Sequence, residues 1–227
     1  NPQNLYLYAF YNIGIGDFFS VALPLTAVSL IALLAASMLL LPSQLPEQKL
    51  TQADIDSRKS LLIYVSLFAL CLLTVFRIVP YLLTTAITVA VLLVVNRKLL
   101  KEIDFMLLLT FVCFFTVSEN LGRMETVRAF LQQLLHQNTL LTAVATSQVI
   151  SNVPAALLLS GFTDSAEPLL IGVNLGGLGT LIASMASLIS YKYIARSGAH
   201  KGRYLGWFTG ANVAFLAVLL IFWVVLY

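Results

Sequence analysis

Seven long apolar segments leave this chain little choice of fold. They lie at 19–41, 60–76, 79–96, 104–118, 139–162, 169–191 and 204–227. A helix crosses the hydrocarbon core of a bilayer with about 20 apolar residues, and its backbone must be hydrogen-bonded internally because lipid offers no partners. Only 10% of the residues are charged, whereas soluble domains carry about 25%. The sequence therefore predicts an all-α, polytopic membrane protein embedded in the lipid bilayer.

The remaining composition argues against several classes of function. The net charge of +3 is spread over loops and indicates no nucleic-acid partner. Cys71 and Cys113 lie inside apolar segments, which is typical of small packed residues rather than of a disulfide framework. His136 and His200 lack metal-ligand spacing, and the chain has no nucleophile–base set, phosphate loop or nucleotide motif. We therefore expect no enzyme activity and no cofactor other than a bound sodium ion.

Three clusters of cations predict the orientation in the membrane. They lie in the loops 42–59, 97–103 and 192–203. Short loops rich in Lys and Arg stay in the cytoplasm, so we expect these loops on the inner side of a bacterial-type plasma membrane. The loops before and after segment 139–162 must then both lie outside. This segment cannot be a single crossing.

A polar interruption explains how segment 139–162 can enter and leave on the same side. It reads Ser151-Asn152-Val153-Pro154, and Pro154 removes a backbone donor and disfavours a helical conformation at Val153. Irregular backbone at membrane depth is tolerated where it lies against protein or a watery cavity. We therefore predict a re-entrant hairpin whose two short helices meet near 151–154.

The two ends of the chain share a pattern. Residues 1–11 and 184–193 each form a polar break with a short amphipathic helix, followed by a glycine turn and a long apolar helix. The turn at 198–202 belongs to a cationic loop, whereas the turn at 14–16 has only Asp17 beside it. The two turns are therefore expected on opposite faces. Such an inverted-topology repeat is a recurrent plan of secondary transporters, in which broken helices and hairpin tips meet at the midplane.

Three polar interruptions are candidates for a binding site. Their candidate residues are Asn1 and Asn4; Ser151, Asn152 and Pro154; and Asn174, Gly176, Gly177, Thr180, Ser184 and Ser187. Oxygen-rich breaks suit a sodium ion, for which Ser151 and Asn152 are the expected ligands. A half-helix that begins after Thr180 would direct its positively polarised N-terminus at an anion.

Each candidate also has a structural interpretation. Gly172 and Gly176 form a small-xxx-small pair, which favours close helix packing over ligand binding. A Ser-Asn pair in a membrane helix more often bonds a neighbouring helix, although its place at a hairpin tip favours function here. Glu119, at the end of segment 104–118, could be a proton-linked carboxylate, but an interfacial position is the stronger interpretation.

These interruptions carry a resemblance to a known group of proteins. The stretch 146–155 resembles the second-half hairpin of the ion transporter superfamily, which includes arsenite and citrate permeases, divalent-anion:sodium symporters and sodium/proton antiporters. The run 174–180 resembles the broken helix that follows that hairpin. The opening stretch 1–5 is similar to the end of the matching first-half helix, where Gly-x-Pro-x-Asn is usual. Val153 and Pro154 stand where the symporters usually have Thr, which is closer to the arsenite-permease and antiporter branch.

The resemblance implies a scaffold domain, a transport domain, an elevator-type displacement and a homodimer. It also implies that a first hairpin precedes Asn1 in a longer protein. The expected organisation is the end of a broken helix at 1–16, a transmembrane helix and cytoplasmic linker at 17–59, scaffold helices at 60–103, and a second-half transport region at 104–227 with its hairpin at 139–162 and broken helix at 169–191.

Three functions follow from these patterns. The leading hypothesis is a secondary active transporter that moves a small anion, either a carboxylate or an oxyanion, coupled to sodium or protons. The second is a sodium/proton antiporter on the same fold, which needs a titratable carboxylate such as Glu119. The third is a membrane subunit that does not transport and uses its polar breaks to bind a partner.

Overall fold

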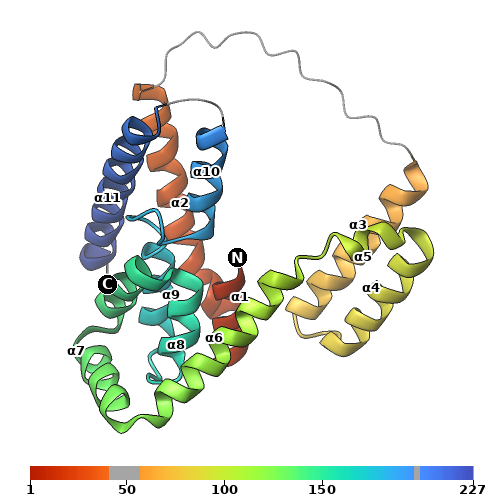
Figure 1. Ribbon diagram of the computed structural model, residues 1–227, viewed down its shortest axis with the longest axis horizontal. Helices are drawn as coiled ribbons and strands as arrows, with labels where there is room; N and C mark the ends of the chain where they lie inside the picture. The colour runs from red at the N-terminus through yellow and green to blue at the C-terminus, as the bar shows by residue number, and fades with distance from the viewer. Residues whose placement is uncertain (41–56, 197–199, 227) are drawn as a thin grey trace. The chain divides into compact units, whose positions relative to one another are not determined.

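The computed structural model describes residues 1–40, 57–196 and 200–226, and every regular element in these ranges is a helix. The chain forms two compact units (Figure 1). The larger unit comprises Asn1–Leu41 and Leu109–Tyr227, and the smaller unit comprises Pro42–Leu108. The expected cytoplasmic linker falls largely on residues 41–56, which lie outside the described residues.

Within the described ranges, three helices are long and apolar enough to cross a membrane: α2 (Ile15–Leu40), α3 (Arg58–Val75) and α11 (Lys201–Leu226). Large apolar side chains on all three are exposed, including Leu33, Phe68 and Val224. Water would penalise such exposure by about 25 cal/mol per Å² of apolar surface, whereas lipid does not. The helical architecture and these apolar surfaces confirm an all-α membrane protein.

The smaller unit is a helical hairpin with a short third helix. Its arms are α3 and α4 (Tyr81–Val95), and α5 (Arg97–Lys101) follows. The hydroxyls of Thr74 and Thr84 lie 2.5 Å apart and join the two arms near their turn. Arg77 has a φ of 61° within that turn. The assignment of this unit as a scaffold stays a prediction.

The core of the larger unit is a group of three packed helices. They are α7 (Glu125–Ile150), α8 (Asn152–Ser160) and α9 (Ala166–Leu175). The helix α7 is interrupted at Asn138, whose φ of −162° and ψ of 100° are not helical. The Asn138 Oδ1 atom accepts a hydrogen bond from the Leu141 amide at 2.9 Å and so caps the second arm. This second arm and α8 run antiparallel and are joined by one residue, Ser151.

Two tyrosines attach the first helix, α1 (Pro2–Phe10), to the end of α8. The Tyr6 hydroxyl lies 2.9 Å from Ser160 Oγ. The Tyr11 hydroxyl donates to the carbonyl oxygen of Thr163 at 2.7 Å. Leu7, between them, is completely buried. Helix α1 is therefore held by both polar bonds and apolar packing.

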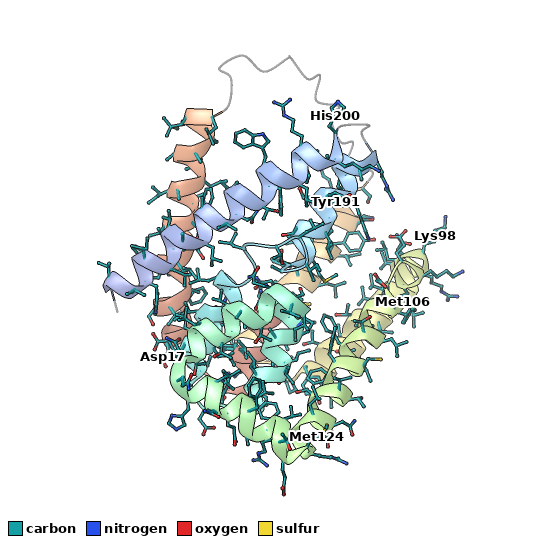
Figure 2. All side chains as sticks on the ribbon, turned by 60° about the vertical axis from the view of Figure 1, so that its left-hand side comes forward. Asp17, Lys98, Met106, Met124, Tyr191 and His200 are labelled. Atoms are coloured by element: carbon teal, nitrogen blue, oxygen red, sulfur yellow. The ribbon has the colours of Figure 1, made fainter. Side chains whose placement is uncertain are left out.

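The helices α2 and α11 pack against each other and run in opposite directions, and α10 (Met185–Arg196) packs against α11 (Figure 1). The helix α6 (Phe105–Arg123) leads into α7. Figure 2 places Asp17 and Met124 toward one end of the larger unit and Tyr191 and His200 toward the other. The first residues of α2 and α11 therefore lie toward opposite ends. The inverted repeat itself stays a prediction.

Candidate functional site

The hairpin tip consists of a single strained residue. Ser151 connects α7 to α8 with a φ of 75° and a ψ of 154°, a region used almost only by glycine. Its Oγ donates to the carbonyl oxygen of Ala183 at 3.3 Å. The amide of Asn152 donates to the same oxygen at 2.9 Å. The tip is thereby bonded to the segment between α9 and α10.

That segment, residues 176–184, is the break predicted inside 169–191. It has no regular helix, and Gly179 has a φ of 112°. Gly177 lies against the hairpin tip, because a Cβ there would be 2.9 Å from Asn152 Nδ2. Asn152 itself is only 7% exposed. The structure thus brings together Ser151, Asn152 and Gly177 from two of the three predicted interruptions.

The second half-helix begins later than predicted. The sequence indicated a start after Thr180, but α10 begins at Met185. Ser184 caps it, because its Oγ accepts from the Ser187 amide at 3.2 Å. The two hydroxyls also lie 3.0 Å apart. Ser184 and Ser187 therefore have a structural role at the start of α10. Their predicted role as ligands of a substrate or ion stays a prediction.

Two helix N-termini meet at this place. The helix α8 begins at Asn152, and the bond from its amide to Ala183 brings it beside the start of α10. No hydrogen bond from the amides of Val153, Met185 or Ala186 is found within the described part of the chain. Pro154, in the first turn of α8, has no amide hydrogen and is buried. Its position is compatible with the helix because first-turn amides lack intrahelical partners.

A hydrogen bond between Asn4 and Asn174 joins the polar interruption near the N-terminus to the end of α9, just before the break. The Asn174 Nδ2 donates to Asn4 Oδ1 at 2.6 Å and to the carbonyl of Leu170 at 2.7 Å. Both asparagines line a cavity of about 260 Å³, together with Thr26 and Ser29 of α2 and apolar residues. Asn1, by contrast, is exposed, and its side chain makes no capping bond to α1.

The glycines of α9 have the packing role that the sequence also allowed. A Cβ at Gly172 would lie 2.6 Å from the Cβ of Ala143. A Cβ at Gly176 would lie 2.6 Å from Ser147 Oγ. Both distances are too short for real atoms, so α9 can approach α7 this closely only with glycine at these positions.

Glu119 is an exposed residue of α6 with an ion-pair partner on the same helix. Its carboxylate accepts a 2.6 Å hydrogen bond from Arg123 one turn later on α6, and both side chains are more than 70% exposed. None of the described residues 148–154 and 174–187 is charged. In the described part of the chain, no three His, Cys, Asp or Glu side chains form a group that could hold a metal ion.

One residue of the site escaped the sequence analysis. The Gln148 side chain, on α7, donates from Nε2 to the carbonyl oxygens of Gly176 and Leu178, both at 2.9 Å. Its Oε1 accepts from the Thr180 amide at 2.9 Å. The Thr180 hydroxyl in turn donates to the backbone oxygen of Gln148 at 3.1 Å. The only available signal was a polar residue one turn before the hairpin tip.

Comparison with known proteins identifies the family. The chain is 34% identical over 205 residues to an uncharacterized transporter of Methanocaldococcus jannaschii. The aligned region covers 90% of this chain and 55% of that protein. It is 27% identical over 196 residues to the inner membrane protein YbiR of Escherichia coli, and here the aligned region covers 85% of this chain and 52% of that protein. The chain therefore spans about half the length of these curated relatives. No solved structure matches.

The family profile described as "Citrate transporter" matches residues 1–189. This match includes the hairpin, its tip and the whole break, which are the features that carried the resemblance to the ion transporter superfamily. The resemblance is confirmed: the chain belongs to the citrate transporter family.

Proposed function

We propose that this protein is a secondary active transporter that moves a small anion, coupled to sodium or protons, across a bacterial-type plasma membrane. One observation carries the proposal. The N-termini of α8 and α10 meet through the bond between the Asn152 amide and Ala183, in a polar site whose side chains are uncharged. Each N-terminus carries a partial positive charge of about half a unit.

This arrangement suits an anion better than a cation as the substrate. Helix N-termini present amide hydrogens, and an anion there gains about 0.3–1 kcal/mol per helix at exposed sites and up to ~2 kcal/mol in partly buried ones. The amides of Val153, Met185 and Ala186 supply such donors. The family description names citrate, which supports a carboxylate among the small anions.

The same site offers oxygen ligands for a coupling cation. They are the Ser151 hydroxyl, the side-chain oxygen of Asn152 and the carbonyl oxygens of Gly177 and Gly179, to which no hydrogen bond is found within the described residues. Sodium is a hard cation and binds such neutral oxygens. Proton coupling would need a titratable group, which residues 148–154 and 174–187 lack. These ligands favour sodium over protons.

The division into two compact units supports an elevator-type displacement. Such a mechanism needs one body that carries the substrate and another that stays in place. The larger unit contains the hairpin and the break, whereas the smaller unit contains α3, α4 and α5. We propose that the larger unit moves and that the protein works as a homodimer, as the superfamily resemblance implies.

Uptake into proteoliposomes tests this function. The complete protein would be assayed with citrate, succinate, sulfate and arsenite, each with sodium or with choline in its place. We expect uptake of at least one anion to require sodium, and Asn152→Ala to reduce it about tenfold or more, which corresponds to ~1.4 kcal/mol. The matched control is Asn212→Ala, because the Asn212 side chain bonds the carbonyl of Phe208 on its own helix α11.

Each outcome of this assay has a definite meaning. Unchanged uptake in Asn152→Ala would remove the hairpin tip from the site. Exchange of sodium for protons without any anion, abolished by Glu119→Gln, would replace the proposal by an antiporter. Absence of both activities in a protein that is folded would favour a membrane subunit without transport of its own.

A further inference from the structure

Gln148 makes an unusual set of hydrogen bonds for a side chain within a helix. Three of its side-chain contacts reach backbone groups 28 to 32 residues away: the carbonyls of Gly176 and Leu178 and the amide of Thr180. Polar side chains in such helices more often bond a carbonyl of their own helix. Gln148 bonds Val144 in that way too, but at a longer 3.3 Å.

The side-chain amide of Gln148 supplies hydrogen-bond partners that the backbone of residues 176–180 does not find within the break. The NH₂ group has two hydrogens and the oxygen is an acceptor, and Gln148 uses them to bond two carbonyls and one amide of the segment 176–180 that have no backbone partner among the described residues. Such an intramolecular hydrogen bond contributes about 0.5–1.5 kcal/mol. Glycine at position 179 is also required, because its φ of 112° is unfavourable for other residues and a Cβ would collide with Gln148 Oε1.

These bonds decide which backbone oxygens of the break stay available. Gln148 engages the carbonyls of Gly176 and Leu178. The carbonyls of Gly177 and Gly179, which alternate with them, accept no hydrogen bond within the described residues. An unwound segment without this anchor could rotate and exchange the two pairs.

We propose that Gln148 is a positioning residue of the transport site: it holds the break in the one backbone geometry that binds the coupling cation and the anion. This inference rests on the proposed function. Gln148 touches neither ligand in this account and acts through the backbone of residues 176–180. The hairpin and the break are thereby kept in register during transport.

The variant Gln148→Glu can distinguish a hydrogen-bonding role of Gln148 from a role in side-chain packing. Gln148→Glu keeps the size of the side chain, but an ionised carboxylate has no donor and would face the carbonyl oxygens of Gly176 and Leu178. A protonated carboxyl group regains one donor. The variant should therefore work poorly at high pH and recover as the pH falls, which a merely structural replacement would not do.

The first test is sodium-dependent uptake by the complete protein with Gln148→Glu and with Gln148→Met, which has a similar length but no hydrogen bonds. We expect the sodium concentration for half-maximal uptake to rise about tenfold in Gln148→Met, with a smaller change in the maximal rate. Gln148→Glu should match it at high pH and approach the wild type at low pH. Gln133→Glu, an exposed position on the same helix, is the control and should keep the wild-type pH profile. A wild-type profile in Gln148→Glu would overturn the proposal.

The second test does not depend on transport. Hydrogen exchange of the Thr180 amide, measured in the complete protein without substrate, should be faster in Gln148→Met than in the wild type by about tenfold. Equal exchange would overturn the proposal even if uptake were impaired. If the wild type moved none of the anions, the proposed function would fail, and the exchange rates would still decide whether Gln148 holds the break.

Discussion

Ser151 allows the strain of the hairpin tip to be separated from the chemistry of its hydroxyl. A non-glycine residue with this φ of 75° and ψ of 154° carries about 1–3 kcal/mol of backbone strain. Ser151→Gly removes both the strain and the hydroxyl. Ser151→Ala removes the hydroxyl alone and keeps the Cβ that causes the strain.

The difference in stability between the two variants can be worked out. Both lose the 3.3 Å bond to Ala183, so its contribution cancels. Glycine gains about 1–3 kcal/mol from relief of strain and loses about 0.5–1 kcal/mol through the greater freedom of its unfolded chain. The midpoints of these two ranges leave Ser151→Gly more stable than Ser151→Ala by about 1 kcal/mol, a difference of about 2–4 °C in melting temperature for a chain of this size.

The assay is thermal unfolding of the complete protein in one detergent, with the two variants side by side. Ser66 provides the control, since it lies within α3 and its hydroxyl bonds the carbonyl of Leu62. There the order should reverse, with glycine less stable than alanine by about 1 kcal/mol. If Ser151→Ala were as stable as Ser151→Gly, the conformation assigned to the tip would be refuted. Uptake with unchanged sodium dependence in Ser151→Gly would remove the hydroxyl from the set of cation ligands.

Two further predictions concern the surroundings of the break. Gly176→Val should lower the melting temperature, with a loss of about 1–3 kcal/mol, because a Cβ alone would meet Ser147 Oγ at 2.6 Å; Gly206→Val on α11 faces open space and should not lower it. Ser184→Ala should cost about 1 kcal/mol by removing the cap on α10, whereas Ser184→Asn retains an acceptor and should recover most of the loss. An equal loss in both Ser184 variants would show that capping is not its role.

The positions of the breaks could be predicted because they depend on local chemistry. Pro154 cannot donate, and the glycines at 176, 177 and 179 weaken a helix, so the sequence placed the interruptions correctly near 151 and 176. The interruption at Asn138 likewise coincides with the start of the apolar segment 139–162. The re-entrant placement of the hairpin and its domain assignment remain predictions.

The connections between the breaks could not be predicted, because they join residues far apart in the chain. Its place one turn before the hairpin tip is all that distinguishes Gln148 in the sequence from Gln132 or Gln133 on the same helix. Its role depends on the carbonyls that a later segment presents. The late start of α10 has the same origin. Thr180 bonds Gln148 through its amide and its hydroxyl, and Ser184 is the residue that caps α10.

The two tyrosine bonds at the end of α1 restrict how this protein can move. Because Tyr6 and Tyr11 bond Ser160 and Thr163, the returning arm of the hairpin cannot swing outward without breaking both bonds and exposing Leu7. A gate that opens by hinging this arm would meet that resistance in every cycle. If α1 and the hairpin move as one block, these contacts stay intact. The contacts that must then break and reform are those between the block and the helices around it.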